Sequence, residues 1–289
     1  IDILAEDVID LGQYDEKIDA HGRYVCAGFI DTHSDKIEQI IQPRPTSVMD
    51  FEMGLKEIER QLINQGITTI YHSISLYQDD YFGASELEAF DIVSKMLREK
   101  TVHEISFMDH TPGQGQYRNI ETYRKTITAY HGETVTTLGF EGVLEHHKNK
   151  RTLSFEQLHE LAELARANGI PAASHDDDTA AKLQVNKELG VAISEFPITI
   201  DVARQAQQLG LATVVGAPNI LLGGSHTGNL SAAEAVKEGC ADILCSDYYP
   251  AAMLHSIFIM HKQHGVPLPE IVNKLTLNPA RAMCIDNDY

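Results

Sequence analysis

The stretch "KEIERQLINQGITTIYHSIS", residues 56–75, decides the fold because a helix, a stop and a strand follow one another in it. Ile58 and Leu62 continue a helical spacing of apolar residues that starts at Phe51. Gly66 can take the left-handed conformation on which helices commonly end, and the β-branched run after it is typical of a buried strand. The stretch therefore predicts one helix followed by one strand.

The same succession of helix, glycine and strand recurs along the chain, with helix-ending glycines at Gly169, Gly190, Gly210 and Gly239. Strands that alternate with helices indicate a parallel sheet covered by helices. With a first strand in "GFIDTHSD", the pattern predicts strands near residues 28–33, 67–74, 104–109, 170–175, 191–195, 211–216 and 241–246.

The length of 289 residues fits a single α/β barrel. The predicted strands are one short of a closed eight-stranded barrel, and the place where a strand is expected to be missing is around residues 99–104. The strand-like residues 135–141 lie between charged, helix-like segments and are not counted. Residues 1–26 have short extended pieces and no helical period, which indicates part of a small β domain. The barrel is therefore expected over residues 27–289.

Composition argues against several classes of protein. Asp and Glu number 42 against 23 Lys and Arg, a formal charge of -19, so a general nucleic-acid or anionic-membrane surface is not expected. No apolar run approaches the roughly 20 residues of a membrane-spanning helix, and no signal peptide opens the sequence, so we expect a soluble cytoplasmic protein. The four cysteines show no Cys-x-x-Cys spacing, which makes a zinc ribbon or a disulfide framework unexpected.

Acids and imidazoles follow almost every predicted strand, at the carboxyl ends where barrels place their functional groups. They are His33 and Asp35, His72, Asp109 and His110, His175 and Asp176, Glu195, and Asp247. Nitrogen and carboxylate ligands without thiolates suit zinc, manganese or iron, with room for one or two ions. Individual members have simpler explanations: the acids after His175 could cap the next helix, and Asp247 could do the same.

A glycine-rich turn, "TPGQGQ" at residues 111–116, could bring backbone N–H groups close to phosphates. Cations in or just after rim segments are candidates for binding phosphate oxygens, although each alone is more often a solvated surface charge. The candidate substrate-binding residues are Lys36, Arg44, His110, Gln114, Arg118 and Asn219.

The strings "GFIDTHSD" (28–35) and "LCSDY" (244–248) resemble the first and last strands of the amidohydrolase superfamily. Longer strings, "SFMDHTPGQGQYR", "ASHDDDT", "GAPNILLGGSHTGNLSA" and "CSDYYPAAML", resemble its PhnM-type branch, the diphosphatases of phosphonate catabolism. The resemblance implies a metal-dependent hydrolase on a distorted (β/α)8 TIM barrel, with remnants of a small β-sandwich at the N-terminus.

The resemblance also implies roles for single residues. The metal ligands would be His33, Asp35, His175, Asp247, Asp109 and His226, and Asp247 would also take the proton from the attacking water. His33-Ser34-Asp35 replaces the His-x-His of the superfamily. The family carries a His-x-Arg segment and a Glu before the "FMDH" strand, whereas only "REKTVHE" (98–104) precedes it here. This difference leaves one bridging ligand unassigned.

The implied reaction is hydrolysis of α-D-ribose 1-methylphosphonate 5-triphosphate to the 5-phosphate and pyrophosphate. Zinc is the first choice of metal, with manganese or iron as alternatives. The expected partners are a second copy of the chain, as a homodimer, and other phosphonate-pathway proteins. Two other hypotheses stay open: an amidohydrolase acting on the C–N bonds of a cyclic amide or base, and a ligand-binding barrel without catalysis.

Overall fold

The computed structural model describes residues 18–44, 47–73, 86–108, 111–130, 132–148, 153–225 and 228–287. Its strands are β1 (Phe29–Ser34), β2 (Ile67–His72), β3 (Ile105–Phe107), β4 (Ala172–His175), β5 (Ile193–Glu195), β6 (Ala212–Gly216) and β7 (Ile243–Cys245). Every one of them lies within two residues of its predicted bounds, so the strand prediction is confirmed.

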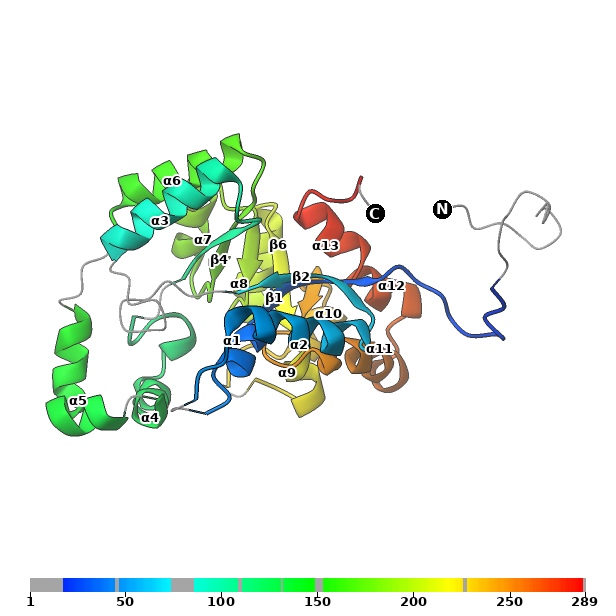
Figure 1. The fold of residues 1–289 in the computed structure, drawn as a ribbon, viewed down its shortest axis with the longest axis horizontal. Coiled ribbons are helices and arrows are strands. Elements are labelled where there is room, and N and C mark those ends of the chain that lie inside the picture. Colours follow the sequence, from blue (N-terminus) through cyan, green and yellow to red (C-terminus); the bar gives the residue numbers. More distant parts are fainter. Residues whose placement is uncertain are drawn as a thin grey trace.

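The helices follow the strands as the sequence pattern predicts (Figure 1). They are α1 (Lys36–Ile41), α2 (Phe51–Ile63), α3 (Glu86–Glu99), α4 (Ile120–Tyr130), α5 (Gly132–Lys148), α6 (Phe155–Ala167), α7 (Ala180–Glu188), α8 (Ile200–Gln208), α9 (Ala217–Leu222), α10 (Ala232–Lys237), α11 (Ala251–His264), α12 (Leu268–Asn273) and α13 (Leu277–Ala282), with a 3-10 turn, η3, at Gly115–Tyr117. In α2, the Asp50 side chain caps the first turn by accepting from the Met53 N–H, and Gly66 after the helix has φ 79°.

All strand pairs are parallel. β1 pairs with β2, and β3 to β7 pair in sequence order. A bridge between Ser34 and Asp247 joins the end of β1 to the chain just after β7, so the strands follow the order β2, β1, β7, β6, β5, β4, β3. Among the described residues no pairing joins β2 to β3. The described strands therefore form a distorted barrel in which β2 and β3 are not paired, and residues 100–104 before β3 form no strand.

Residues 135–141 lie in α5, which bends at Gly139 (φ 71°), so they form no strand, as expected. Residues 18–28 run away from the barrel as irregular chain with a turn at His21 and Gly22 (Figure 1). Residues 1–17 lie outside the described part of the chain, so the small N-terminal β domain and the boundary after residue 26 stay predictions.

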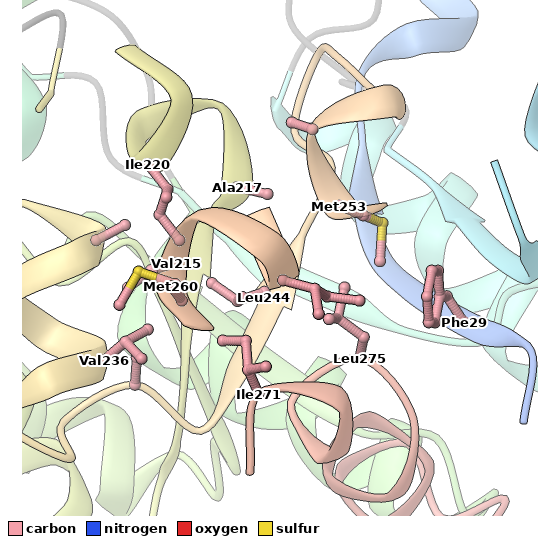
Figure 2. Packing of buried hydrophobic residues seen from close by; sticks show 14 of the residues in the cluster. Phe29, Val215, Ala217, Ile220, Val236, Leu244, Met253, Met260, Ile271 and Leu275 are labelled. Carbon is pink, nitrogen blue, oxygen red and sulfur yellow. The ribbon is translucent and has the colours of Figure 1, made fainter. Parts of the chain in front are cut away.

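The main hydrophobic core holds β1 and β7 together. Figure 2 shows Met253 and Met260 of α11 among the side chains that surround Leu244 of β7, with Phe29 of β1 at one side and Leu275 beside it. Burial of each large apolar side chain contributes about 1.5–3 kcal/mol. The core thus fixes the two strands that carry His33 and Asp247 to the same rim.

A second cluster consists of Ala173, Ile193, Val214, Ile243 and Cys245, which come from β4 to β7, and of Met283 after α13. These apolar side chains lie on neighbouring parallel strands, and polar residues follow them at the carboxyl ends of β4, β5 and β7. In the described part of the chain, no helix has both the length and the apolar composition to span a bilayer.

Candidate metal centre

His33, at the end of β1, lies between two carboxylates. Its ring is buried, with Nδ1 3.1 Å from Oε1 of Glu195 and Nε2 3.5 Å from Oδ1 of Asp35. Asp35 is the N-cap residue of α1, but its side chain makes no capping hydrogen bond. Helix capping therefore does not explain why an acid stands at this position.

β4 and β5 place two further candidate ligands side by side, because His175 and Glu195 are register partners. Both side chains are buried, and the His175 ring centroid lies 5.4 Å from that of His33. Nδ1 of His175 is 2.8 Å from Oδ2 of Asp176. Ser106 of β3 donates a hydrogen bond of 2.9 Å to Oε2 of Glu195. Both ligand side chains are thus oriented by a polar neighbour.

Asp247 reaches the same rim just after β7. Its N–H donates to the His33 carbonyl (3.0 Å), and its own carbonyl accepts from the Asp35 N–H (2.8 Å), which fixes its backbone against β1. Its φ is 54°, a left-handed conformation that aspartate tolerates better than most residues. The following helix, α11, has Pro250 as its N-cap residue, so Asp247 does not cap it.

Asp31 is a buried acid with a different task. Its Oδ1 accepts from the Ser246 N–H (2.8 Å), and the hydroxyls of Ser246 and Ser34 lie 2.9 Å apart. Burial, partly offset by hydrogen bonds from Ser246, raises the pKa of Asp31 to about 7. Asp31 therefore ties the ends of β1 and β7 together and supports the backbone of Asp247.

Gly216, at the end of β6, leaves room for the Asp247 side chain. A Cβ at this position would lie 3.3 Å from Oδ2 of Asp247 and 3.5 Å from the ring of Phe196. Phe196 follows Glu195 with φ 52°, and its ring packs against His33 (centroids 5.1 Å apart) and His175 (4.9 Å). A bulky residue in a left-handed conformation is strained, and such strain is concentrated at functional sites.

Two groups of side chains could each hold a cation: His33 with His175 and Glu195, and His33 with Asp35 and Asp247. Within each group the potential ligand atoms lie within 4.8 Å of one another. Ligand atoms at about 2.1 Å from a tetrahedral ion are about 3.4 Å apart, so small side-chain movements would close either group on an ion. The nitrogen and oxygen donors fit zinc, manganese or iron.

Glu104, one residue before β3, is a site residue that sequence reasoning missed. Its Oε1 is buried and has no hydrogen-bond partner among the described residues. Burial, and then the charge on Glu195, raise the pKa of Glu104 well above its ordinary value. A buried, unsatisfied carboxyl oxygen close to a second carboxylate is what a cation would satisfy. The sequence signal was its position at the start of the predicted strand 104–109.

The electrostatics of the site favour positive charge. Burial alone would lower the pKa of His33, but the charge on Glu195 and the contacts with Asp35 raise it well above 6.5. Burial would raise the pKa of Glu195, but the charge and hydrogen bond of His33, together with the charge of His175 and the hydrogen bond from Ser106, outweigh burial and lower that pKa. The buried acids therefore need a cation between them, and either a protonated imidazole or a metal ion can supply it.

The profile described as "Amidohydrolase family" matches residues 24–289 of the chain. The chain belongs to the amidohydrolase family. It is accordingly a metal-dependent hydrolase, and the imidazole and carboxylate groups of the two clusters are its candidate metal ligands.

One curated relative of this amidohydrolase is the α-D-ribose 1-methylphosphonate 5-triphosphate diphosphatase of Escherichia coli (strain K12). It is 30% identical over 306 residues, an alignment that covers 93% of this chain and 80% of the relative. This match supports the PhnM-type resemblance that the sequence motifs indicate.

Solved structures agree with the fold. A crystal structure of an uncharacterized protein has a TM-score of 0.55 at 12% identity, covering 90% of this chain and 75% of that one. A crystal structure of an amidohydrolase has a TM-score of 0.51 at 13% identity, covering 94% and 80%. At these identities the likeness extends to the fold alone.

The structure brings together five of the side chains singled out at the rim: His33, Asp35, His175, Glu195 and Asp247. The predicted residues Asp109, His110 and His226 lie outside the described residues. The three acids after His175 do not cap α7, whose N-cap is Thr179 accepting from the Lys182 N–H. Asp176 instead contacts His175, and Asp178 accepts from the N–H of Gly115 (2.9 Å).

That last hydrogen bond ties the glycine-rich turn to the loop after β4, so the turn lies at the rim. Gln114 in this turn and Arg118 just after it are exposed. Lys36 donates to Gln39 (3.1 Å), and Arg44 is exposed beside the first helix. The Asn219 amide donates to the Leu230 carbonyl and accepts from the Ala232 N–H. Substrate contacts by these residues stay predictions.

Proposed function

We propose that this amidohydrolase cleaves the phosphoanhydride of α-D-ribose 1-methylphosphonate 5-triphosphate, releasing pyrophosphate and the 5-phosphate. The observation that carries the proposal is the pair of candidate ligand groups that share His33 at the barrel rim. The similarity to the E. coli diphosphatase over 93% of the chain supports the choice of substrate.

The ligands we assign to one or two divalent ions are His33, His175 and Glu195 in one group and Asp35 and Asp247 with the shared His33 in the other. Glu104 is our candidate for the bridging carboxylate that the sequence left unassigned. Asp109 and His226 remain further candidate ligands. A divalent ion bound here would supply Lewis-acid chemistry, by lowering the pKa of water and offsetting charge on phosphoryl oxygens. Zinc is our first choice, with manganese or iron as alternatives.

Asp247 is our candidate for the group that takes the proton of the attacking water. The hydrogen bonds of its backbone to His33 and Asp35 fix its position, and the missing side chain of Gly216 leaves space around its Oδ2. A positioned general base of this kind contributes about 10²- to 10⁴-fold to the rate.

The substrate is a polyanion and the chain carries a formal charge of -19, so local groups must attract the phosphates. A hollow of about 540 Å³ lies beside the glycine-rich turn, lined among others by Gly113, Gln114, Thr179 and Lys182. We assign the phosphate end of the substrate to this part of the rim. The contacts that we propose come from Lys36, Arg44, His110, Gln114, Arg118 and Asn219.

The proposed setting is the cytoplasm, where the protein would act as a homodimer alongside other proteins of phosphonate catabolism. An excess of acidic residues and the small phosphorylated substrate are consistent with this setting. Analytical ultracentrifugation of the purified protein tests the dimer.

Phosphorus NMR of the reaction products tests the proposed reaction. Protein stripped of metal with a chelator is incubated with the ribose methylphosphonate triphosphate, and zinc, manganese or iron(II) is added in separate samples. We expect no pyrophosphate without metal, release of pyrophosphate with at least one metal, and a loss of about 10²-fold or more in kcat for Asp247→Asn.

Full pyrophosphate release by the stripped protein would contradict the role of the metal. Ammonia or a ring-opened product from cyclic amides or bases, without turnover of the triphosphate, would favour the C–N hydrolase. Metal binding without turnover of either class of substrate would favour a barrel that only binds its ligand.

A further inference from the structure

Behind the ligand pair His175 and Glu195, a buried carboxylate joins the two strands that carry it. Asp177 is fully buried, and its Oδ2 accepts hydrogen bonds of 2.6 Å from the hydroxyls of both Ser174 and Ser194. Ser174 and Ser194 are register partners in β4 and β5, one residue before the partners His175 and Glu195. One oxygen atom thus connects the residues directly behind the two candidate ligands.

The other atoms of Asp177 extend this connection. Its Oδ1 accepts from the Asn186 side chain of α7 (2.7 Å), and its carbonyl accepts from the Ile198 N–H in the loop after β5 (2.9 Å). The Asp176 N–H donates to the Glu195 carbonyl (2.9 Å), so the two strand ends also meet through their backbones. A buried polar network that is fully satisfied in this way rigidifies its surroundings.

The turn that Asp177 belongs to needs such support. Asp176 has φ 55°, a conformation that costs free energy unless its surroundings impose it. Lys182 of α7 donates to the carbonyls of His175 (3.0 Å) and Asp176 (3.3 Å) from one side. Asp177 holds the turn from the other side, through the two serines.

We propose that Asp177 is a positioning residue, which sets the spacing of His175 and Glu195 through its hydrogen bonds to Ser174 and Ser194. It makes no contact with the metal or the substrate itself. Partners of this kind typically change metal affinity by about 10- to 100-fold when they are removed. The inference rests on the proposed metal site.

The test compares Asp177→Ala and Asp177→Asn with a matched control. Asp242 also anchors a network of hydrogen bonds, accepting from the N–H and hydroxyl of Thr213 and from Gln207, but it lies before β7, away from the carboxyl ends of the strands. Asp242→Ala is therefore the control, because it removes a comparable hydrogen-bond network that does not support the candidate ligands. Zinc and manganese affinity of each variant is measured by calorimetry on metal-free protein.

We expect Asp177→Ala to weaken metal binding by about 10- to 100-fold. Asp177→Asn should stay close to wild type, because an amide oxygen can accept from both serines. Asp242→Ala should lower stability and leave metal affinity unchanged. If Asp177→Ala destabilises the fold while metal affinity stays at the wild-type value, Asp177 is only structural. If Asp177→Asn binds metal as weakly as Asp177→Ala does, the charge of Asp177 matters and the positioning role is wrong.

Hydrogen exchange in metal-free protein separates this inference from the proposed function. Loss of the network should speed exchange of the Asp176 amide by about 10-fold or more, since that amide bonds to the Glu195 carbonyl. Unchanged exchange of the Asp176 amide in Asp177→Ala would overturn the positioning role. A wild-type protein that binds no metal would instead overturn the proposed metal site. Should Asp177→Ala not fold, Ser174→Ala and Ser194→Ala each remove one donor and are expected to change exchange and affinity in the same direction.

Discussion

Nδ1 of His33 lies 3.1 Å from Oε1 of Glu195, although 162 positions of the chain separate the two residues. They come from β1 and β5, which are not neighbours in the sheet. The contact therefore spans the barrel rim, and it brings a carboxylate from one side of the rim to an imidazole from the other. Because both groups are buried, the pair is expected to dominate the charge of the site.

Glu195→Gln should weaken metal binding because it removes a negative charge but keeps the shape of the side chain. The loss of affinity is expected to exceed the roughly 10- to 100-fold typical of a partner that only orients a ligand. Calorimetric titration of metal-free protein with zinc and manganese measures it. Glu160→Gln on the exposed face of α6 is the control, and equal affinity in the two variants would remove Glu195 from the ligand set.

Metal should also stabilise the folded protein. A ligand at 100 times its dissociation constant adds about 2.7 kcal/mol to the free energy of unfolding. We expect the thermal midpoint of the stripped wild type to rise when zinc or manganese is added, and a His33→Ala variant to show little of this rise because His33 belongs to both groups. A shift of the same size in that variant would place the bound metal elsewhere.

Gly216→Ala should reduce activity more than stability. The added methyl group would stand 3.3 Å from Oδ2 of Asp247, so the carboxylate that we assign to proton transfer must move. A displacement of this kind lowers kcat by about 10-fold or more. Gly132→Ala is the control, since a Cβ there meets nothing within 4 Å. Steady-state kinetics decide the matter, and a normal kcat in Gly216→Ala would show that Asp247 tolerates displacement.

Five of the strands were predictable because a helical period and a helix-ending glycine precede each of them in the sequence. The convergence of His33, His175 and Asp247 followed from parallel topology alone. The different partners of three consecutive aspartates could not be predicted from the sequence. Asp176 contacts an imidazole, Asp177 accepts from two serines, and Asp178 accepts from a backbone N–H. Which partner each aspartate meets depends on the path of the turn and on neighbouring strands, and no local pattern encodes it.

Glu104 shows the same limit. The sequence placed it at the start of the predicted strand 104–109, but its value as a ligand depends on how closely β3 approaches Glu195 from the far side of β4. Ser106 of the same strand donates to Glu195, which shows that β3 does reach the site. Contacts across two strands depend on sheet curvature, and the hydrophobic pattern carries no information on it.

Phe196→Gly should be more stable than Phe196→Ala, which reverses their usual order. Both variants lose the ring that packs on His33 and His175. At φ 52°, however, alanine keeps the strain of a left-handed residue, whereas glycine does not. The expected difference is about 1 kcal/mol in the free energy of unfolding. Urea denaturation of the two metal-free variants measures it, and a more stable alanine variant would show that the backbone is not strained there.

Lys274 should make the free energy of unfolding depend on pH in the alkaline range. Its Nζ is buried and donates to the Ala241 carbonyl (2.7 Å), and burial lowers its pKa from 10.5. Just below pH 10.5 the Lys274 amine therefore binds its proton more tightly in the unfolded chain than in the folded one. The contribution of Lys274 to the free energy of unfolding consequently rises as the pH approaches 10.5 from below. Urea unfolding of wild type and Lys274→Met across this range isolates the effect, because other groups cancel in the difference. We expect the free energy of the wild type minus that of the variant to grow with pH, and a constant or falling difference would mean that Lys274 stays fully charged in the folded protein.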